Sequence, residues 1–194
     1  MENAMCNRDK MLLSAIDLIA EKGYKGVTTQ EIAAAAGVSE KTLFRHFGCK
    51  RKLIDEAFER FHYTEEMSKL FQETVTWDLH ADLLLIARKY HEMMNRNRKM
   101  ILISIKDEAH LPGIRQQTQQ HPRRLMEFLT QYFVTMSEKG KLARTNPEIQ
   151  ALSFLMMHFG AFLNELEKDE NFPGVTLDAF IEESVLIFAK ALTP

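Results

Sequence analysis

The stretch TTQEIAAAAGVSEKTLFRHF, residues 28–47, predicts the local structure near the start of this chain. Thr28 and Glu31 have the spacing of a capping box, in which the side chain of each residue binds the backbone amide of the other at a helix start. Gly37 is expected to end this short helix in a left-handed turn, and Ser39 to cap the next helix almost at once. Two short helices joined so closely predict a helix-turn-helix.

The apolar residues of this stretch predict how the two helices pack. Ile32 and Ala36 are expected to face inward, and the small side chain of Ala33 allows the second helix to approach closely. Leu43 and Phe47, four positions apart, are expected to bury one face of the second helix. The opposite face of that helix is left to solvent.

The exposed face carries side chains that bind nucleic acid. A helix turns by about 100° per residue, so Lys41, Thr42 and Arg45 point outward once the apolar pair is buried. A recognition helix meets base edges with its N-terminal half, and the free amides at the start of the preceding helix favour a phosphate. The residues predicted on this basis to contact DNA are Thr28, Thr29, Gln30, Glu40, Lys41, Thr42, Arg45 and His46.

Three consecutive cations, Lys50, Arg51 and Lys52, open the helix that follows. Cations at this end oppose the helix dipole, so their presence needs a reason. One explanation is a solvated charge run. We favour a second one, in which the phosphate backbone of DNA passes over this helix start, because it agrees with the neighbouring helix pair.

The N-terminal quarter of the chain resembles the TetR family of bacterial transcriptional regulators. The resemblance lies within residues 8–58 and is carried by LIAEKGY at 18–24 and by the stretch at 28–47. It implies a homodimer, a helix-turn-helix formed by the second and third helices, and a helical ligand-binding and dimerisation domain behind them. It also implies that Thr42, Phe44, His46 and Lys50 lie at positions that the family uses against DNA.

Three residues depart from the family pattern. Phe44 stands where the family often has tyrosine, so a hydroxyl that could bind a phosphate is lost. Cys49 stands at a cap position where serine is common, and Lys52 stands where an acid often closes the capping box. The start of the fourth helix is therefore expected to be less well capped and more basic than usual.

The rest of the chain predicts further helices and no sheet. Apolar residues recur at spacings of three and four, which is typical of helices, in residues 78–95, 97–109, 122–138, 147–168 and 176–192. Alternating strand patterns are absent. We therefore predict an all-α protein of about nine helices, with a helix-turn-helix domain at 1–48 and a ligand-binding and dimerisation domain at 49–194.

Composition alone does not reveal a nucleic-acid partner. The 194 residues are 45% hydrophobic and 27% charged, as in globular proteins, and the net charge is only −2. The segment from Lys22 to Lys52 contains seven Lys and Arg residues and only two Glu, so it is basic. The rest of the chain must then be acidic to give the small net charge. No signal peptide or membrane-spanning run is visible, and the two cysteines lack metal-ligand spacing, so we expect a bacterial cytoplasmic protein.

A dimer interface is predicted near the C-terminus. Residues 147–168 are apolar on most of the helix circumference, so the helix must be covered on more than one side. Paired with the last helix, it would form a four-helix bundle across a twofold axis, although an intramolecular core is the alternative. The predicted interface residues are Leu152, Met156, Phe159, Gly160, Leu163, Ile181, Val185 and Phe188.

The resemblance places an effector pocket between the middle helices. The candidate lining residues are Phe61, His62, Phe71, Trp77, Tyr90, Met94, Phe128, Tyr132, Met157 and His158. Few fixed charges occur among them, so we expect a largely apolar or aromatic small molecule as the effector. Histidines in this part of the chain, His91 among them, could orient a polar group of that molecule.

Two other classes of protein are alternatives, a di-iron helical bundle and a protein-interaction module. Glu59 and His62 have the spacing of a di-iron helical bundle, and Asp107 and His110 form an imperfect second copy, but further inward carboxylates are not identified. A protein-interaction module that has lost DNA binding would not require the cations of the exposed face. No nucleophile elbow, phosphate loop or dinucleotide fingerprint is present. We therefore predict a non-enzyme without metal or cofactor, a dimeric repressor that a small molecule releases from a palindromic operator in double-stranded DNA.

Overall fold

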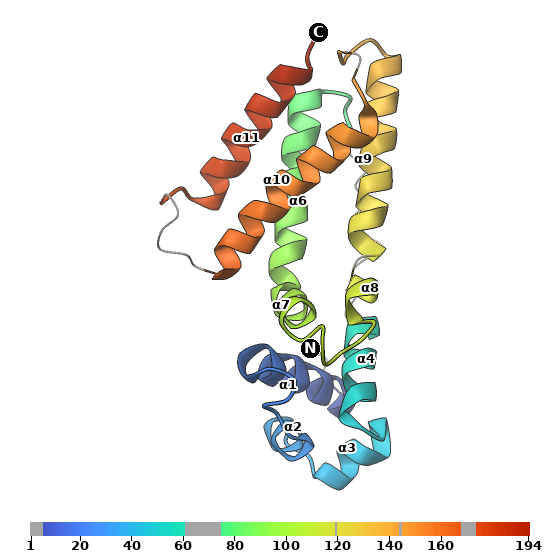
Figure 1. Cartoon of the computed structure of the whole chain (residues 1–194), viewed down its shortest axis with the longest axis vertical. Helices are drawn as coiled ribbons and strands as arrows, with labels where there is room; N and C mark the ends of the chain where they lie inside the picture. Colours follow the sequence, from blue (N-terminus) through green and yellow to red (C-terminus); the bar gives the residue numbers. More distant parts are fainter. Residues whose placement is uncertain (1–5, 61–74, 119, 144, 168–173) are drawn as a thin grey trace. The chain divides into compact units, whose positions relative to one another are not determined.

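The computed structural model describes residues 6–60, 75–118, 120–143, 145–167 and 174–194. Within these ranges the chain forms helices and no strand (Figure 1), which confirms the predicted all-α fold. None of the helices in the described ranges is long and apolar enough to cross a membrane. The helices divide into two compact units.

The first compact unit contains the helix-turn-helix and helices from a distant part of the chain. Its helices are α1 (Asn7–Lys22), α2 (Thr29–Ala35), α3 (Glu40–Phe47), α4 (Lys50–Arg60), α7 (Arg98–Lys106) and α8 (Ile114–Thr118). One hydrophobic core runs through them, and α1 packs against α2, α4 and α7. Leu12, Ile32, Leu43 and Leu53 lie at its centre and are fully buried.

This unit extends beyond the division predicted at residue 48. Leu53 and Phe58 of α4 and Met100 and Ile103 of α7 belong to the same core as the helix-turn-helix. The reason is that α2 and α3 are each only about two turns long and cannot cover their own apolar faces. Longer helices must supply that cover.

The second compact unit contains the long helices. They are α6 (Leu79–Arg96), α9 (Gln120–Glu138), α10 (Pro147–Glu167) and α11 (Leu177–Leu192). Helix α11 packs along α6, and α10 contacts both. Phe188 of α11 lies 5.5 Å from Phe154 and 6.3 Å from Phe133, measured between ring centroids, so aromatic contacts join α11 to α10 and α9.

Candidate nucleic-acid interface

Helix α2 begins with the predicted capping box. The Thr28 hydroxyl accepts a hydrogen bond from the Glu31 amide at 3.2 Å, and the Glu31 carboxylate accepts one from the Thr28 amide at 2.8 Å. The Thr28 hydroxyl also donates to this carboxylate, and Lys22 forms an ion pair with it at 3.2 Å. These donors, with the Thr28 amide first, lower the pKa of Glu31 from 4.5 to about 2.

Because of this cap, the stability of the first unit should depend on pH. Because the pKa of Glu31 is lower in the folded state, its contribution is present above pH 4.5 and is lost as the pH falls toward about 2. We expect Glu31→Gln to flatten the loss of stability over that interval, measured by urea unfolding at several pH values. Thr28→Ala, which removes the hydroxyl but keeps the amide donor, should give an intermediate slope. Parallel pH profiles for wild type and Glu31→Gln would contradict this expectation.

A tight turn joins α2 to α3. Gly37 has a φ of +70°, in the left-handed region predicted for it, and the Val38 amide donates to the Ala33 carbonyl at 2.9 Å. Ser39 then caps α3, since its hydroxyl accepts from the Thr42 amide at 3.2 Å. The two hydroxyls of Ser39 and Thr42 lie 2.9 Å apart, within hydrogen-bond distance. The cap therefore holds Thr42 at the start of α3.

A side-chain hydrogen bond links the two helices of the motif. The Thr29 hydroxyl donates to the Glu40 carboxylate at 2.6 Å. Both residues are predicted DNA contacts, and the structure shows that they also bind each other. This hydrogen bond holds the start of α3 against the start of α2. Sequence spacing does not reveal this positioning role.

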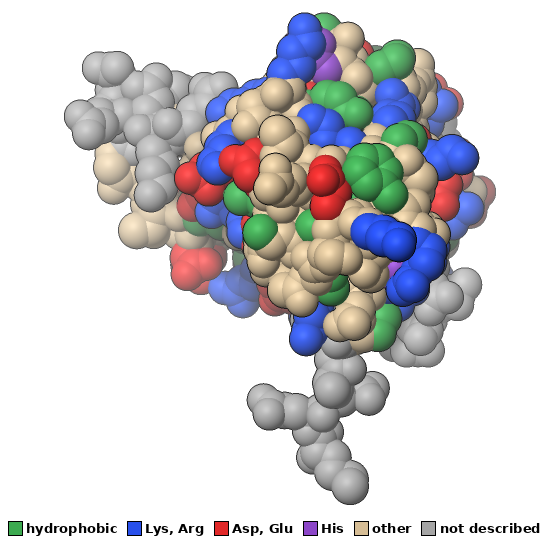
Figure 2. All heavy atoms as spheres, turned by 90° about the horizontal axis from the view of Figure 1, so that it is seen from below, with side chains coloured by type: hydrophobic (Ala, Val, Ile, Leu, Met, Phe, Trp, Pro, Cys, Tyr) green, Lys and Arg blue, Asp and Glu red, His purple; other side chains and the backbone are tan. Residues whose placement is uncertain are grey.

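Helix α3 presents an exposed face opposite its buried side. Leu43 and Phe47 are buried as predicted, whereas Lys41, Arg45 and His46 are exposed. Phe44 is also 44% exposed, so this face carries an apolar ring beside its cations. In Figure 2, seen from below the view of Figure 1, Lys and Arg side chains border hydrophobic ones on the face that α2 and α3 form.

Two of the three cations at the start of α4 bind within the first unit. The Lys50 ammonium donates to the carbonyls of Tyr24 and Val27, both at 2.6 Å, and lies 4.2 Å from the centre of the Tyr24 ring. Burial lowers the pKa of Lys50, although Asp107 and Glu31 oppose this shift. Lys50 was predicted to contact DNA, but its described partners are backbone carbonyls.

Arg51 also binds other residues of the first unit, whereas Lys52 points to solvent. The Arg51 guanidinium donates to Asp55 at 2.8 Å and to the Pro112 carbonyl at 2.7 Å, so it joins α4 to the loop before α8. Lys52 is exposed. Of these three neighbours, Lys52 is therefore the one whose position best fits a phosphate contact.

Lys50→Ala and Lys52→Ala form a matched pair. We expect Lys50→Ala to lower the free energy of unfolding by about 1–3 kcal/mol, because two carbonyls lose a charged donor. Lys52→Ala should change it by less than about 0.5 kcal/mol, since its side chain is exposed. Urea denaturation of the full chain measures both. Equal losses for the two variants would contradict the assignment of Lys50 as an internal tether.

The comparisons identify the family. Residues 12–57 match the family model described as bacterial regulatory proteins, tetR family. Residues 81–191 match the one described as AefR-like transcriptional repressor, C-terminal domain. Over 184 residues the chain is 31% identical to the HTH-type transcriptional regulator YvkB of Bacillus subtilis. The alignment covers 95% of this chain and 96% of YvkB. The chain belongs to the TetR family. It is therefore a DNA-binding transcriptional regulator and not an enzyme.

Solved structures share the fold of this TetR-family protein. NalD, the secondary repressor of the MexAB-OprM multidrug efflux pump in Pseudomonas aeruginosa, aligns with a TM-score of 0.71 at 20% identity over 96% of both chains. AibR, solved in complex with isovaleryl coenzyme A and operator DNA, aligns with a TM-score of 0.67 at 23% identity. That alignment covers 94% of this chain and 97% of AibR. At these identities the likeness shows the fold alone.

The predicted ligand residues of the TetR-family chain do not all lie at one site. Phe61, His62 and Phe71 lie outside the described residues. Trp77 stacks on Tyr132 at 5.9 Å near the start of α6, whereas His158 contacts His91 more than two turns further along that helix. Tyr90, Met94, Tyr132 and His158 are buried, and Trp77, Phe128 and Met157 are half-buried. The set therefore contains two separate groups.

A buried carboxylate organises the first group. Asp82 accepts hydrogen bonds from the Thr76 amide and hydroxyl, the Trp77 amide and the Tyr132 hydroxyl, at 2.8–2.9 Å. Trp77 has a φ of +63°, rare for so large a residue, and Lys141 donates to its carbonyl at 2.7 Å. Asp82 was not predicted, and its position four residues after a helix-capping Asp78 is the only sequence signal for it.

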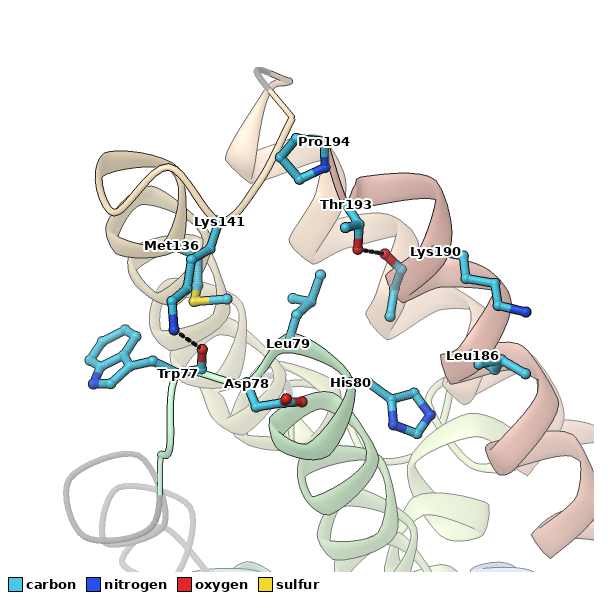
Figure 3. A pocket seen from close by; sticks show the side chains of 11 residues that line it. Trp77, Asp78, Leu79, His80, Met136, Lys141, Leu186, Lys190, Thr193 and Pro194 are labelled. Carbon is cyan, nitrogen blue, oxygen red and sulfur yellow. Dashed lines mark hydrogen bonds between the residues drawn. The ribbon is translucent and has the colours of Figure 1, made fainter.

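An open hollow of about 440 Å³ lies at this end of the second unit (Figure 3). Leu79, Met136 and Ala189 contribute apolar surface, and Lys141 and Lys190 also line it. Among the predicted ligand residues that the structure describes, Trp77 alone lines the hollow. The hollow therefore includes one of the residues predicted for the effector site, and that site stays a prediction.

The predicted dimer-interface residues divide into exposed and buried ones. Leu152 and Met156 of α10 are 48% and 53% exposed. Gly160 is exposed, and Phe159, Leu163 and Phe188 are half-buried. Ile181 and Val185 are buried within the unit, because their side of α11 packs on α6. They therefore belong to the core of the unit and not to its surface. Two residues that were not predicted, Ile149 and Ile187, are exposed instead.

Within the described residues, no three His, Cys, Asp or Glu side chains gather as metal ligands. Of the di-iron candidates, Glu59 lies on α4 and His62 lies outside the described residues. Asp107 and His110 lie between α7 and α8 in the first unit. No described geometry therefore favours the di-iron alternative.

Proposed function

We propose that this TetR-family protein is a ligand-responsive repressor that binds a roughly palindromic operator as a homodimer. A largely apolar small molecule bound in the second compact unit would release it. The observation that carries the DNA-binding part is the exposed face of α3, which presents Lys41, Phe44, Arg45 and His46 to solvent. The Ser39 cap and the Thr29–Glu40 bond hold the start of α3, and Leu43 and Phe47 bury the opposite face.

The four exposed residues have complementary chemistry toward DNA. Lys and Arg pair with guanine or phosphate, and an exposed Phe can contact the methyl group of thymine. Thr42, held by the Ser39 cap, and Gln30, exposed in the first turn of α2, are the neighbouring polar candidates. Lys52 and the amides at the start of α2, near Thr28, would contact the phosphate backbone.

The homodimer is supported by apolar surface on α10 and α11. Ile149, Leu152 and Met156 recur at spacings of three and four, so they form one stripe along α10, and Ile187 of α11 is 66% exposed. An exposed stripe of this kind marks an interaction surface, and a twofold axis would pair it with itself. The two recognition helices would then reach major grooves about one helical turn, or about 34 Å, apart, or further apart if two dimers share a site.

Repression and the binding of a small molecule are supported by proteins of the same fold. NalD is a secondary repressor, and AibR was solved with both a coenzyme A ester and operator DNA. For release, the ligand must bind one dimer geometry more tightly than the other. The geometry that it favours would be the one whose recognition helices do not fit the operator.

Selection of bound sequences from random DNA tests the proposal directly. The full chain should enrich a roughly palindromic sequence, and compounds can then be screened for release of the selected DNA. Failure to enrich any sequence would contradict operator binding and favour a protein-interaction module. Enrichment without symmetry would contradict binding as a twofold dimer.

Lys41→Ala measures base readout on the selected operator. If Lys41 pairs with a base edge, its loss should weaken binding by about 1–3 kcal/mol and relax the sequence preference at one position of each half-site. Lys106→Ala, which removes an exposed cation from α7 of the same unit, is the control and should retain both affinity and preference. Titration of both variants against operator and mismatched DNA by fluorescence anisotropy provides the measurement. A uniform loss on all sequences would assign Lys41 to phosphate instead.

A further inference from the structure

A pair of buried histidines lies in the second unit between α6 and α10. The Nε2 atom of His91 is 3.2 Å from the Nδ1 atom of His158, within hydrogen-bond distance. The two rings meet edge to face, with centroids 5.3 Å apart. His91 is 2% exposed and His158 is fully buried.

This pair has one free donor and one free acceptor. Burial lowers the pKa of His91 to about 4 and that of His158 to about 3, so both rings are neutral near pH 7. Each neutral ring has one N–H and one lone pair, and the bond between the rings uses one of each. The remaining N–H and lone pair are therefore located at His91 Nδ1 and His158 Nε2, in either order.

Neither of these two atoms has a hydrogen-bond partner among the residues that the structure describes, and both are buried. Such atoms are rare in folded proteins, because they have lost water without gaining another partner. The described neighbours are aromatic: Phe154 lies 4.5 Å from His158 between ring centroids, Phe180 5.9 Å, and Tyr90 5.7 Å from His91. These rings offer apolar contact, and none of them forms a hydrogen bond with the two atoms.

We infer that the His91–His158 pair is the hydrogen-bonding anchor of the effector site, and that the effector is a neutral molecule with a hydroxyl group on an apolar or aromatic body. This rests on the proposed function, because it names the ligand class of that regulator. A hydroxyl both donates and accepts, so it satisfies whichever role a free ring nitrogen takes. A carboxylate would have to leave water without a countercharge from the neutral rings, which is unfavourable.

The position of His158 suggests how binding would reach the dimer. His158 lies two residues after Met156 on α10, so the same helix carries the anchor on its buried side and the proposed interface stripe on its exposed side. A ligand that moves α10 would therefore change the interface surface within the same unit.

Binding of small probes to the full chain without DNA tests this inference. The probes are 4-ethylphenol and 1-octanol, with 4-ethyltoluene as the analogue of the phenol that lacks a hydroxyl, and 4-ethylbenzoate as the anion. We expect at least one of the two hydroxyl probes to bind. If 4-ethylphenol binds, the affinities of 4-ethyltoluene and 4-ethylbenzoate should be at least tenfold weaker than its affinity. In protein with ¹⁵N-labelled histidine, the bound probe should shift the ring resonances of His91 and His158.

Variants separate the anchor from general packing. His158→Phe should weaken binding of the hydroxyl probe at least tenfold and leave 4-ethyltoluene unchanged. His158→Gln retains hydrogen-bonding groups and provides a second variant if His158→Phe does not fold, with circular dichroism as the check. His80→Phe, at an exposed position on α6, is the control and should bind as wild type does.

The inference is overturned if neither hydroxyl probe binds at millimolar concentration, or if the probes bind without shifting the two ring resonances. Equal affinity for 4-ethylphenol and 4-ethyltoluene would also overturn it. A water that stays bound to the pair in the presence of probe would show that the two atoms hold solvent only. Operator binding is measured separately. A protein that selects DNA, and is released from it by a compound whose binding is unchanged in His158→Phe, keeps the proposed function but not this anchor.

Discussion

Phe47→Ala is expected to lower the free energy of unfolding by about 3–5 kcal/mol, which is the usual cost of removing a buried aromatic side chain. Phe47 is buried and, with Leu43, attaches α3 to the core of the first unit. The Arg8 guanidinium also lies 5.1 Å from the centre of its ring, so a cation–π contact with α1 is lost too. Because α3 carries the proposed recognition face, specific DNA binding should fall together with stability.

The matched control lies one turn earlier on the same helix. Phe44 is 44% exposed, so Phe44→Ala should change stability by less than about 0.5 kcal/mol. If Phe44 contacts DNA, this variant should weaken operator binding while it remains folded. Urea denaturation and anisotropy titration measure the two effects separately. Similar destabilisation by both variants would contradict the difference in burial between the two phenylalanines.

The double variant Leu152→Glu/Met156→Glu is expected to convert the proposed dimer into a monomer. Both side chains are about half exposed in the single chain, so the substitution should leave the protomer folded. In a twofold interface each carboxylate occurs twice, and burying unpaired charges costs several kcal/mol. We expect the dimer dissociation constant to rise at least about a thousandfold, equivalent to about 4 kcal/mol. Sedimentation velocity measures the change.

Operator affinity should fall with the dimer, because each monomer contacts only one half-site. Gln131→Glu introduces a carboxylate at an exposed position of α9 and is the control, expected to remain dimeric. A wild-type protein that sediments as a monomer at micromolar concentration would contradict the homodimer itself. A double variant that remains dimeric would move the interface to another surface.

The helix-turn-helix could be predicted in detail from the chain alone. The capping box of Thr28 and Glu31, the left-handed Gly37, the Ser39 cap and the buried face of α3 all appear where spacing predicts them. Each of these features depends on residues within about one turn of each other. Backbone geometry at that range is nearly the same in every protein, so residue type and spacing are sufficient to predict it.

The internal role of Lys50 could not be predicted in this way. Its partners are the carbonyls of Tyr24 and Val27, 26 and 23 positions earlier, and Arg51 likewise reaches Pro112 across 61 positions. Every residue has a carbonyl, so no side-chain pattern marks the ones that a distant cation will meet. Only the packing of α4 in the first unit decides that two cations bind protein and that Lys52 remains exposed.

The same distinction applies to the helical unit. The periodicity of α11 shows that it is apolar, but both Val185 and Ile187 satisfy that description. Contact with α6 decides that Val185 is buried and Ile187 is exposed, and it is the crossing of α6 and α10 that brings His91 to His158. Local spacing is therefore enough to predict the helices, their caps and the exposed face of α3. The tertiary structure decided which apolar and polar side chains meet, because that depends on where helices far apart in the chain pack against each other.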